Sequence, residues 1–503
     1  MRIPFIKQYL IYGCLSFVMI CLAILSLKKI IPWVDEVMFT DTPMHYMKGL
    51  GWTTFAWYSV AKQDPFLLYP PLYSMIMVIW MNFFGTTLIA CRSLNLIITM
   101  IIGMGILRIC RQLGLKISLI QIGLLIMLLW CTDDMIYMYS NGRPDLLGAA
   151  ILVFIVSEII CLTKDNKKGW QLVMLSAFLI ATGIQAVAYL YSLLLLAYLT
   201  FTGYHKRIKK IAVLLVLGTL LGFMLICAFM AYHGHLVAFV VNILSYSNTI
   251  MNFAMISLPI FGEYTGIDIT LYMEKIANNT TDVTFLNRIL EIYKHPTYVS
   301  LLVTALLIIF LEHRNLKDNS LYAIMKFLFV IALLIPLLMN ILGRFPDYYY
   351  WMVYIPIFIL MIIFIEFRRY HLIIGLVILF LVIRGLNTSY QHNNYSEIET
   401  FMKKCSMLNN KSVVAPFSVF YEIEKISSHT YYLGVYPLHY LPNDIDYLIL
   451  PPKESGYGVN QLYGYYDSIS RSDSLQTIMV AESKTAGLKV FKLIHNKQFP
   501  NNN

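Results

Sequence analysis

The stretch Trp33-Val-Asp35-Glu36-Val-Met-Phe-Thr-Asp41 places three carboxylates a few residues after the first long apolar run, which extends from about Tyr9 to Leu27. That run is too long for the core of a signal peptide and has no clear small-residue cleavage site, so we expect a retained membrane span. Because Arg2 and Lys7 precede it, the positive-inside rule places its start on the cytoplasmic side. The acidic stretch is then expected outside, at the membrane–water interface.

A carboxylate at such an interface can meet a lipid headgroup and a water-soluble substrate at the same time. Asp35 is therefore a candidate general base for a hydroxyl or amine, and Glu36 is the second candidate catalytic carboxylate, orienting the loop or the acceptor. The alternative interpretation is an acidic loop exposed to water just past the span. An Asp-Glu pair by itself would favour that alternative.

The composition agrees with a membrane protein. Of 503 residues, 58% are hydrophobic and only 13% are charged, whereas a soluble domain has about 25% charged residues. This excludes a large soluble, disordered or fibrous protein. The net charge of +10 comes from short basic clusters between apolar runs, not from a long basic surface with aromatic residues, so no nucleic-acid partner is expected. The eight cysteines show no disulfide framework and no metal-ligand spacing. No cofactor is expected; a divalent metal stays open as an alternative, although the sequence does not indicate one.

The remaining apolar runs predict an all-α polytopic membrane module over residues 1–386. The run 72–84 is short for a ~30 Å hydrocarbon core and follows two prolines, so we expect an interfacial or re-entrant helix there. The prediction is 11 crossings, with 13 as the alternative. Further crossings are predicted near 87–107, 117–132, 146–163, 170–184, 186–203, 209–231, 298–311, 321–342, 348–365 and 371–386. External loops are predicted at 28–71, 132–145, 232–298 and 342–347.

The tail, residues 387–503, differs sharply in composition and is predicted to be a small external (periplasmic) soluble α/β domain. Short β-like runs alternate there with polar segments. These runs are Ser412–Pro416, Thr430–Tyr436, Asp446–Leu450 and Gly487–Ile494.

Two further motifs lie in predicted external loops. In Asn141-Gly-Arg143-Pro-Asp145, the arginine can bind a phosphate, and Asp145 can orient it or the acceptor. The alternative is the start of a helix, where Pro and Asp are both common.

In Gly343-Arg344-Phe-Pro-Asp-Tyr348-Tyr349, an arginine fork precedes aromatic rings that could pack on a sugar. The alternative is an aromatic belt with a snorkelling arginine.

Three smaller features favour structural roles. Asp133-Asp134 is predicted to be a solvated part of an external loop, and His233-Gly-His235 an interfacial turn. Glu158 lies within an apolar run near its predicted inner end, where snorkelling accounts for it.

The order of motifs resembles that of the GT-C membrane glycosyltransferases, in the branch of the protein O-mannosyltransferases and lipid A aminoarabinose transferases (glycosyltransferase families 39 and 83). Asp35-Glu36 is followed by Leu68-Tyr69-Pro-Pro-Leu-Tyr73, then by Phe84-Gly85 and Arg92. The resemblance extends over about residues 30–150. It departs from the family where aminoarabinose transferases carry a Glu-Lys pair, because Leu68-Tyr69 stands there, so aminoarabinose is not carried over as the sugar.

The resemblance implies the GT-C fold and an inverting glycosyltransferase that uses a polyprenyl-phosphate sugar donor. It implies donor-phosphate binding by arginines and substrate binding by an aspartate and tyrosines. The phosphate-binding residues would be Arg344, Arg143 and Arg92, and the substrate-binding residues Asp145, Tyr69, Tyr348 and Tyr349.

The expected partners are the lipid-linked donor, a glycan, lipid or protein acceptor, and the bilayer. The short basic loops favour a bacterial inner membrane, with the active site and the tail on the periplasmic side. Two alternatives remain open. A transporter or flippase would show intramembrane charges and paired halves, and a lipid-linked glycan polymerase would share the chemistry but use a different acceptor.

Overall fold

The computed structural model describes most of the chain and divides it into two compact units. The described residues are 24, 26–27, 31–54, 56, 69–164, 169–183, 205–237, 239–240, 295–316, 320–342, 349–391, 395–432, 444–453, 459–471 and 475–495. The first unit, here called the helical unit, comprises Met1–Leu25, Leu67–Tyr73 and Ser93–Tyr390. The second, the mixed unit, comprises Ser26–Phe66, Ser74–Arg92 and Gln391–Asn503.

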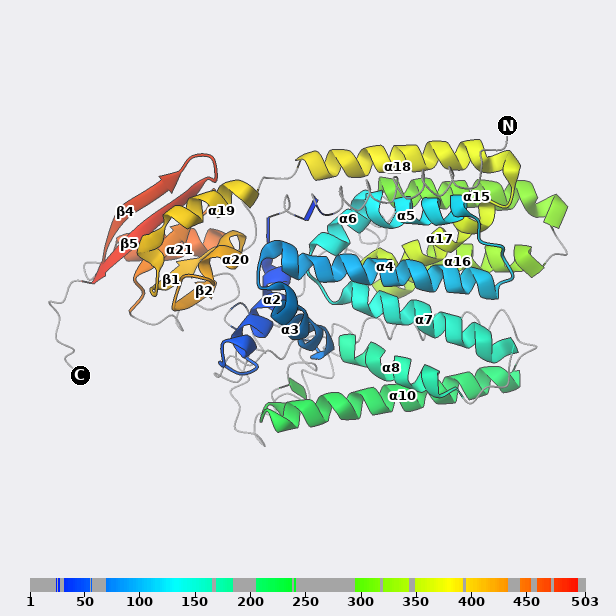
Figure 1. The fold of residues 1–503 in the computed structure, drawn as a ribbon, viewed down its shortest axis with the longest axis horizontal. Coiled ribbons are helices and arrows are strands. Elements are labelled where there is room, and N and C mark those ends of the chain that lie inside the picture. Colours follow the sequence, from blue (N-terminus) through cyan, green and yellow to red (C-terminus); the bar gives the residue numbers. More distant parts are fainter. Residues whose placement is uncertain are drawn as a thin grey trace. The chain divides into compact units, whose positions relative to one another are not determined.

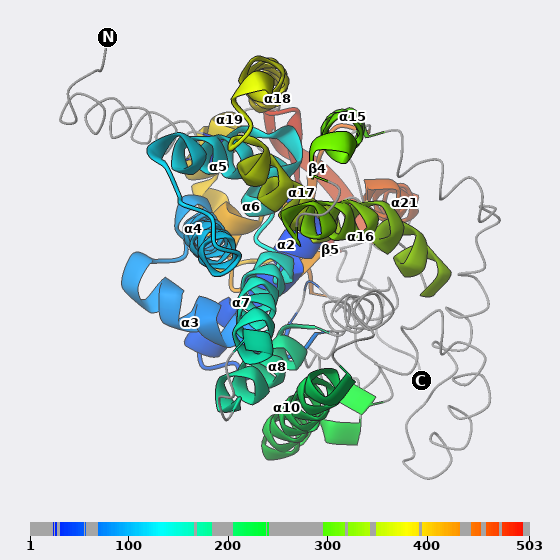
Figure 2. The same ribbon diagram turned by 90° about the vertical axis from the view of Figure 1, so that its right-hand side faces the viewer.

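The helical unit is a bundle of apolar helices. Within it, α8 packs between α7 and α10, and α17 packs against α15 and α16 (Figures 1 and 2). Its first helix is α4 (Leu88–Gln112), of which the part from Ser93 on belongs to this unit. The others are α5 (Leu119–Cys131), α6 (Asp133–Ser140), α7 (Asp145–Lys164), α8 (Trp170–Thr182), α10 (His205–Tyr232), α15 (Pro296–Leu316), α16 (Ser320–Leu342), α17 (Trp351–Phe364) and α18 (His371–Gln391).

Small residues let α8 and α10 approach each other closely. Gly218 and Gly222 of α10 are four residues apart and lie on one face of the helix. A Cβ atom at Gly218 would lie 2.4 Å from the carbonyl oxygen of Val173 in α8, and one at Gly222 would lie 2.6 Å from that of Ala177. Only glycine fits at these contacts, which is the usual way in which membrane helices pack backbone to backbone.

Five of the described helices are long and apolar enough to cross a membrane, and a sixth span results if α5 and α6 count as one span bent by 63°. Other apolar helices have fewer than 18 residues and are too short to be counted as spans. They are α3, α8, α17 and the apolar part of α16. The predicted runs 9–27 and 186–203 and most of the loop 232–298 lie outside the described residues. Several apolar helices are thus confirmed, while the total of 11 crossings stays a prediction.

The mixed unit joins the first loop to the tail. It contains α2 (Val34–Met47), most of α3 (Leu72–Phe84), and a five-stranded sheet with its helices. The sheet order is β2-β1-β3-β5-β4, parallel at β1–β2 and β1–β3 and antiparallel at β3–β5 and β4–β5. The strands are β1 (Ser412–Ala415), β2 (His429–Tyr432), β3 (Tyr447–Leu450), β4 (Leu475–Ser483) and β5 (Leu488–His495).

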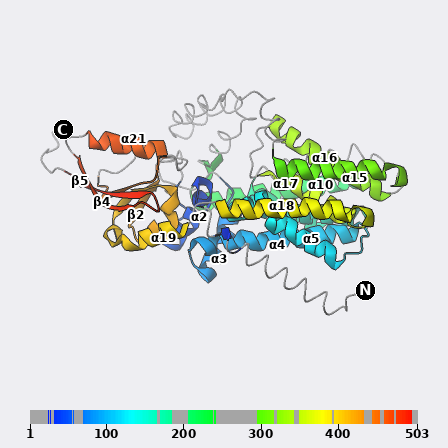
Figure 3. The ribbon, with the colours of Figure 1, turned by 90° about the horizontal axis from the view of Figure 1, so that it is seen from above.

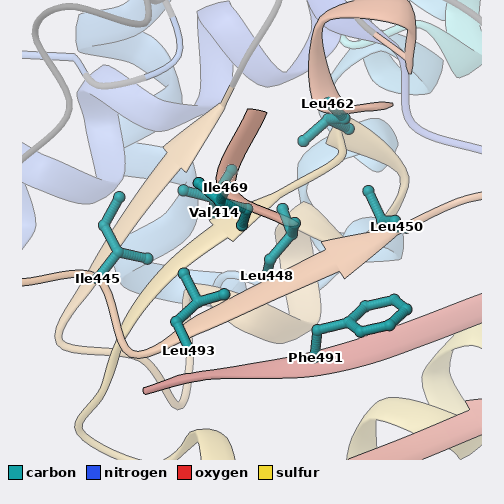
Figure 4. Packing of buried hydrophobic residues seen from close by; sticks show 8 residues of the cluster. All are labelled: Val414, Ile445, Leu448, Leu450, Leu462, Ile469, Phe491 and Leu493. Carbon is teal, nitrogen blue, oxygen red and sulfur yellow. The ribbon is translucent and has the colours of Figure 1, made fainter. Parts of the chain in front are cut away.

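Helices cover both faces of this sheet. Figure 3 shows α21 (Val459–Ser470) on one side and α19 (Tyr395–Lys404) on the other. Leu462 and Ile469 of α21 pack on Val414, Leu448 and Leu450 of the sheet (Figure 4). Leu448 and Leu450 are two residues apart on one strand and therefore face the same side. The predicted small C-terminal domain with a sheet is confirmed.

Strand β4 was not expected from the sequence. Its residues Leu475–Ser483 form the edge of the sheet and carry no alternation of buried and exposed side chains in the middle of the strand. Ile478, Met479 and Val480 are all exposed, and the pairing with β5 is irregular between Met479 and Ala481. The period-two pattern that reveals a strand in a sequence is broken by this irregularity.

Candidate functional site

Glu36 is fully buried and bound on both oxygens by Arg92. The Nε atom of Arg92 donates to Oε1 at 2.7 Å, and Nη2 donates to Oε2 at 2.6 Å. The third guanidinium nitrogen, Nη1, donates to the main-chain oxygen of Leu27 at 2.6 Å. Both side chains have no exposed surface. Arg92, predicted to bind the donor phosphate, is thus directed at Glu36.

Tyr421 completes this cluster from the C-terminal part of the chain. Its hydroxyl donates to Oε1 of Glu36 at 3.0 Å and lies 3.3 Å from the hydroxyl of Thr40, one turn along α2. Burial and the carboxylate of Glu36 raise the pKa of Tyr421 well above its ordinary value, so the hydroxyl keeps its proton and remains a donor. No local sequence signal could have revealed Tyr421, because 385 residues separate it from Glu36.

Asp35 is the accessible member of the acidic pair. It lies in the first turn of α2 and is half-buried, whereas Glu36 points into the protein. Consecutive residues of a helix point about 100° apart, and this separates the two carboxylates into different environments. Asp35 is therefore partly exposed, while Glu36 is not.

The motif Asn141–Asp145 forms a polar cluster at the start of α7, in the helical unit. Arg143 Nε donates to Asp145 Oδ2 at 2.6 Å, and the amide of Asn95 donates to the main-chain oxygen of Arg143 at 3.1 Å. Asn95 in turn accepts from the hydroxyl of Tyr73 at 3.2 Å. Asp145 also lies in the first turn of α7, as the helix-start interpretation expects.

Two small hollows adjoin this cluster. One is lined by Tyr69, Asp145 and Trp351, together with Pro144, Gly148, Thr182 and Gly183. The structure thus brings together Tyr69 and Asp145, two of the predicted substrate-binding residues. The other hollow is lined by Asn141, Arg143 and Asp145, with Met138 and Leu146.

Asn141 was not among the predicted site residues. Its side chain is 1% exposed, and neither its amide nitrogen nor its amide oxygen has a hydrogen-bond partner among the described residues. A buried amide without partners costs about 1–3 kcal/mol, and this one lines a hollow beside an arginine. Such an amide is suited to bind a polar ligand.

The expectation that Asp133-Asp134 forms a solvated loop was wrong. Asp133 is buried, accepts from Thr297 at 2.5 Å and pairs with Arg384 of α18 at 2.8 Å. Asp134 accepts from the hydroxyl of Tyr354 and lies 3.3 Å from the ring of His295. The carboxylates are thus satisfied by partners on or next to α15, α17 and α18.

The other sequence-predicted residues are placed less completely. Tyr349 is 4% exposed, while Arg344 and Tyr348 lie outside the described residues. Glu158, expected to snorkel, is buried and forms an ion pair with Arg108. His233 and His235 follow α10, and burial lowers the pKa of His235.

One group in the mixed unit has the composition of a metal site. Asp41, His45 and Glu424 are buried, and their ligand atoms lie within 4.8 Å of one another. The sequence offered no signal for this group, because Asp41 and Glu424 come from opposite ends of the chain.

The fold of the chain is similar to that of two solved proteins, ArnT and AglB. The structure of ArnT from Cupriavidus metallidurans in the apo state superimposes with a TM-score of 0.51 at 11% identity, over 97% of this chain and 98% of that chain. The same protein bound to undecaprenyl phosphate gives a TM-score of 0.50 at 12% identity, over 97% of both chains.

A second solved structure shares the fold. The oligosaccharyltransferase AglB from Archaeoglobus fulgidus, in complex with an inhibitory peptide and a dolichol-phosphate, gives a TM-score of 0.50 at 10% identity, over 99% of this chain and 76% of that chain. No family model and no curated protein matches the sequence. At these identities the likeness shows the fold.

Proposed function

We propose that the chain is an inverting glycosyltransferase that moves a sugar from a polyprenyl-phosphate donor to a glycan, lipid or protein acceptor at the outer face of the membrane. The observation that carries the proposal is the fold shared over 97% of both chains with ArnT bound to undecaprenyl phosphate. AglB, captured with a dolichol-phosphate, supports the same class of lipid carrier.

Asp35 is proposed as the general base. It takes the proton of the acceptor hydroxyl while the acceptor oxygen forms a bond to the anomeric carbon of the sugar. The bond between that carbon and the phosphate oxygen breaks, and the polyprenyl phosphate leaves with the electron pair. Attack from the side opposite the leaving group inverts the anomeric centre. The half-buried position of Asp35 in the first turn of α2 supports this role.

Glu36 and Arg92 are proposed to position the base. The prediction gave Glu36 a catalytic role and Arg92 a phosphate-binding role. Because each has no exposed surface and they bind each other through two hydrogen bonds, we assign both to fixing the start of α2.

Arg143 is proposed to bind the donor phosphate, with Asn141 added to the predicted residues. Negative charge develops on the phosphate as it leaves, and donors fixed in advance stabilise it. Asp145 orients the guanidinium at 2.6 Å, and Tyr69 lines the adjacent hollow. Arg344, Tyr348 and Tyr349 complete the proposal as phosphate and substrate ligands.

The first test measures binding of the carrier lipid, because this measurement needs no knowledge of the sugar. Purified protein in detergent should bind undecaprenyl phosphate, measured by native mass spectrometry. Membrane glycolipids and glycans of cells with and without the protein, compared by mass spectrometry, then identify the sugar for a transfer assay. Asp35→Asn should lower transfer by ~10²–10⁴-fold with carrier binding retained, and the exposed carboxylate variant Asp467→Asn should be unchanged.

Two results would contradict the proposal. Lipid-linked sugar that crosses the membrane without any new covalent product would identify a transporter or flippase. Wild-type transfer by a folded Asp35→Asn variant would refute the assigned base. A product that grows by repeated units would instead indicate a lipid-linked glycan polymerase with the same chemistry.

A further inference from the structure

We infer that Asp41, His45 and Glu424 form a binding site for a divalent transition-metal ion of the zinc class. This inference is independent of the proposed glycosyl transfer. The three side chains are 0%, 2% and 7% exposed, respectively. Their ligand atoms all lie within 4.8 Å of one another, and imidazole nitrogen and carboxylate oxygen are both ligand atoms that zinc binds.

The helix geometry brings the first two ligands together. Asp41 and His45 are four residues apart on α2 and therefore lie on one face of the helix. His45 Nε2 lies 3.4 Å from Asp41 Oδ1. Two ligands of one tetrahedral zinc, each about 2.0–2.1 Å from the ion, are separated by about 3.3 Å. The spacing in the structure therefore fits two bonds to a common ion.

Hydrogen bonds from outside the trio orient the histidine. The Nδ1 atom of His45 lies 3.0 Å from the hydroxyl oxygen of Thr53, and that hydroxyl donates its only proton to the main-chain oxygen of Leu50 at 3.2 Å. Thr53 must therefore accept from Nδ1–H. In the neutral imidazole this leaves a lone pair on Nε2, the atom that faces Asp41. Histidine ligands of metals are oriented in the same way.

The two carboxylates are oriented as well. Oδ2 of Asp41 accepts from the hydroxyl of Thr54 at 2.7 Å and from the main-chain N–H of Ala56 at 3.1 Å, and Oδ1 faces His45. Oε1 of Glu424, the residue that ends α20 (Phe420–Ile423), accepts from the hydroxyl of Tyr432 at 2.9 Å. Each ligand thus has one atom fixed by an outer partner, as in metal sites whose outer residues set the geometry.

Lys48 balances the charge of Glu424. Its Nζ donates to Oε2 at 2.8 Å and to the main-chain oxygen of Glu424 at 3.0 Å. The lysine side chain is 42% exposed, so it can turn to water without burying its charge. A divalent ion would neutralise both carboxylates, and it would link α2, which carries Asp35 and Glu36, to the end of α20.

The test measures metal content of the full chain in detergent. Protein stripped with a chelator is equilibrated with zinc, desalted and analysed by elemental mass spectrometry. We expect one zinc per chain in the wild type and in His429→Gln, an exposed histidine of the same unit, but almost none in His45→Gln. Zinc should raise the Tm of the wild type and leave that of His45→Gln unchanged.

Two further measurements do not depend on the stability of His45→Gln. Lys48→Met removes a competing cation and should tighten zinc binding by ~10-fold, whereas a site that holds only ion pairs would gain no zinc. X-ray absorption at the zinc edge should show nitrogen and oxygen ligands. Sulfur ligation, or equal zinc in wild type and a folded His45→Gln, would overturn the inference.

Discussion

Arg92 binds both carboxylate oxygens of Glu36, at 2.7 and 2.6 Å, and neither side chain touches water. The two carboxylates of the acidic pair therefore lie in different environments. Glu36 is a fixed internal partner, and Asp35 remains accessible at the start of the same helix.

Removing one partner of this pair should be costly. Arg92→Met leaves the buried carboxylate of Glu36 without its cation, and such a loss typically costs about 3–5 kcal/mol. We expect a large fall in the Tm of the purified protein. The double variant Glu36→Gln/Arg92→Met should recover part of the loss, because the uncompensated charge is gone. If the double variant is no more stable than Arg92→Met, the ion pair is not the main contribution.

Arg92→Lys tests the geometry of the same contact at constant charge. Lysine offers a point charge in place of a planar fork, so it cannot bind both oxygens of Glu36 and the carbonyl oxygen of Leu27. We expect stability between that of the wild type and that of Arg92→Met. A Tm equal to that of the wild type would show that the bidentate arrangement is dispensable.

The buried tyrosines predict an alkaline limit of stability. Burial raises the pKa of Tyr421, and the carboxylate of Glu36 raises it further. Burial also raises the pKa of Tyr432, and the carboxylate of Glu424 raises it further. The folded protein therefore keeps these protons above pH ~10, where an unfolded tyrosine loses its own. The contribution of these tyrosines to stability should be constant below pH ~10 and fall above it, by ~1.4 kcal/mol per pH unit for each tyrosine.

Thermal unfolding between pH 8 and 11 checks this limit. Tyr421→Phe should be less stable than the wild type at pH 8 by about 1.5–3 kcal/mol, because a hydrogen bond to a charged group is lost. The same variant should lose less stability between pH 10 and 11. Tyr466→Phe, a half-buried tyrosine of α21, provides the control. A pH dependence identical in wild type and Tyr421→Phe would contradict the assignment.

The proposed phosphate-binding role of Arg143 and Asn141 predicts that changes at these residues weaken binding of the carrier lipid. Arg143→Lys keeps the charge but loses the fork, and Asn141→Ala removes the buried amide. Each should weaken binding of undecaprenyl phosphate by ~10-fold, since a hydrogen bond to a charged group contributes about 1.5–3 kcal/mol. Asn141→Ala should not lower the Tm, because the amide has no partner to lose among the described residues. Unchanged affinity with a lowered Tm would assign the asparagine a structural role.

Membrane topology gives a prediction of its own. Because α2 and Tyr421 belong to one unit and are joined by direct hydrogen bonds, the first loop and the tail must be on the same side of the membrane. An even number of crossings must then separate them. Cysteines introduced at Lys48 and Asp467 should react with the same impermeant reagent from the same side. Labelling from opposite sides would exclude the arrangement.

Many of the apolar helices could be predicted because hydrophobic length is a local signal. The apolar runs 72–84, 146–163 and 321–342 correspond to α3, α7 and α16 with bounds that differ by at most a residue or two. Four of the five strands were also predicted, since each is a short run of β-branched and aromatic residues. Strand β4 was missed because its exposed edge position and irregular pairing remove the alternating pattern.

The site was predicted less completely because its contacts are distant in sequence. Asp35-Glu36 and Arg143 stand out through charge at the ends of apolar runs. No local sequence pattern indicates that Arg92 forms an ion pair with Glu36. None indicates that Tyr421 and Glu424, from the tail, form hydrogen bonds with residues in and next to α2. Asparagine is a common turn residue, and only the burial of Asn141 without a hydrogen-bond partner in the described part of the chain distinguishes it.

The mixed unit is built from the beginning and the end of the chain, and this sets an order for its biosynthesis. The ribosome makes Glu36 385 residues before it makes Tyr421. All the intervening helices must be inserted before the tail reaches α2. A chain with its tail in the opposite compartment would lack the hydrogen bonds of Tyr421 to Glu36 and Thr40 and the ion pair of Glu424 with Lys48. This unit can therefore close only in molecules whose first loop and tail lie on the same side of the membrane.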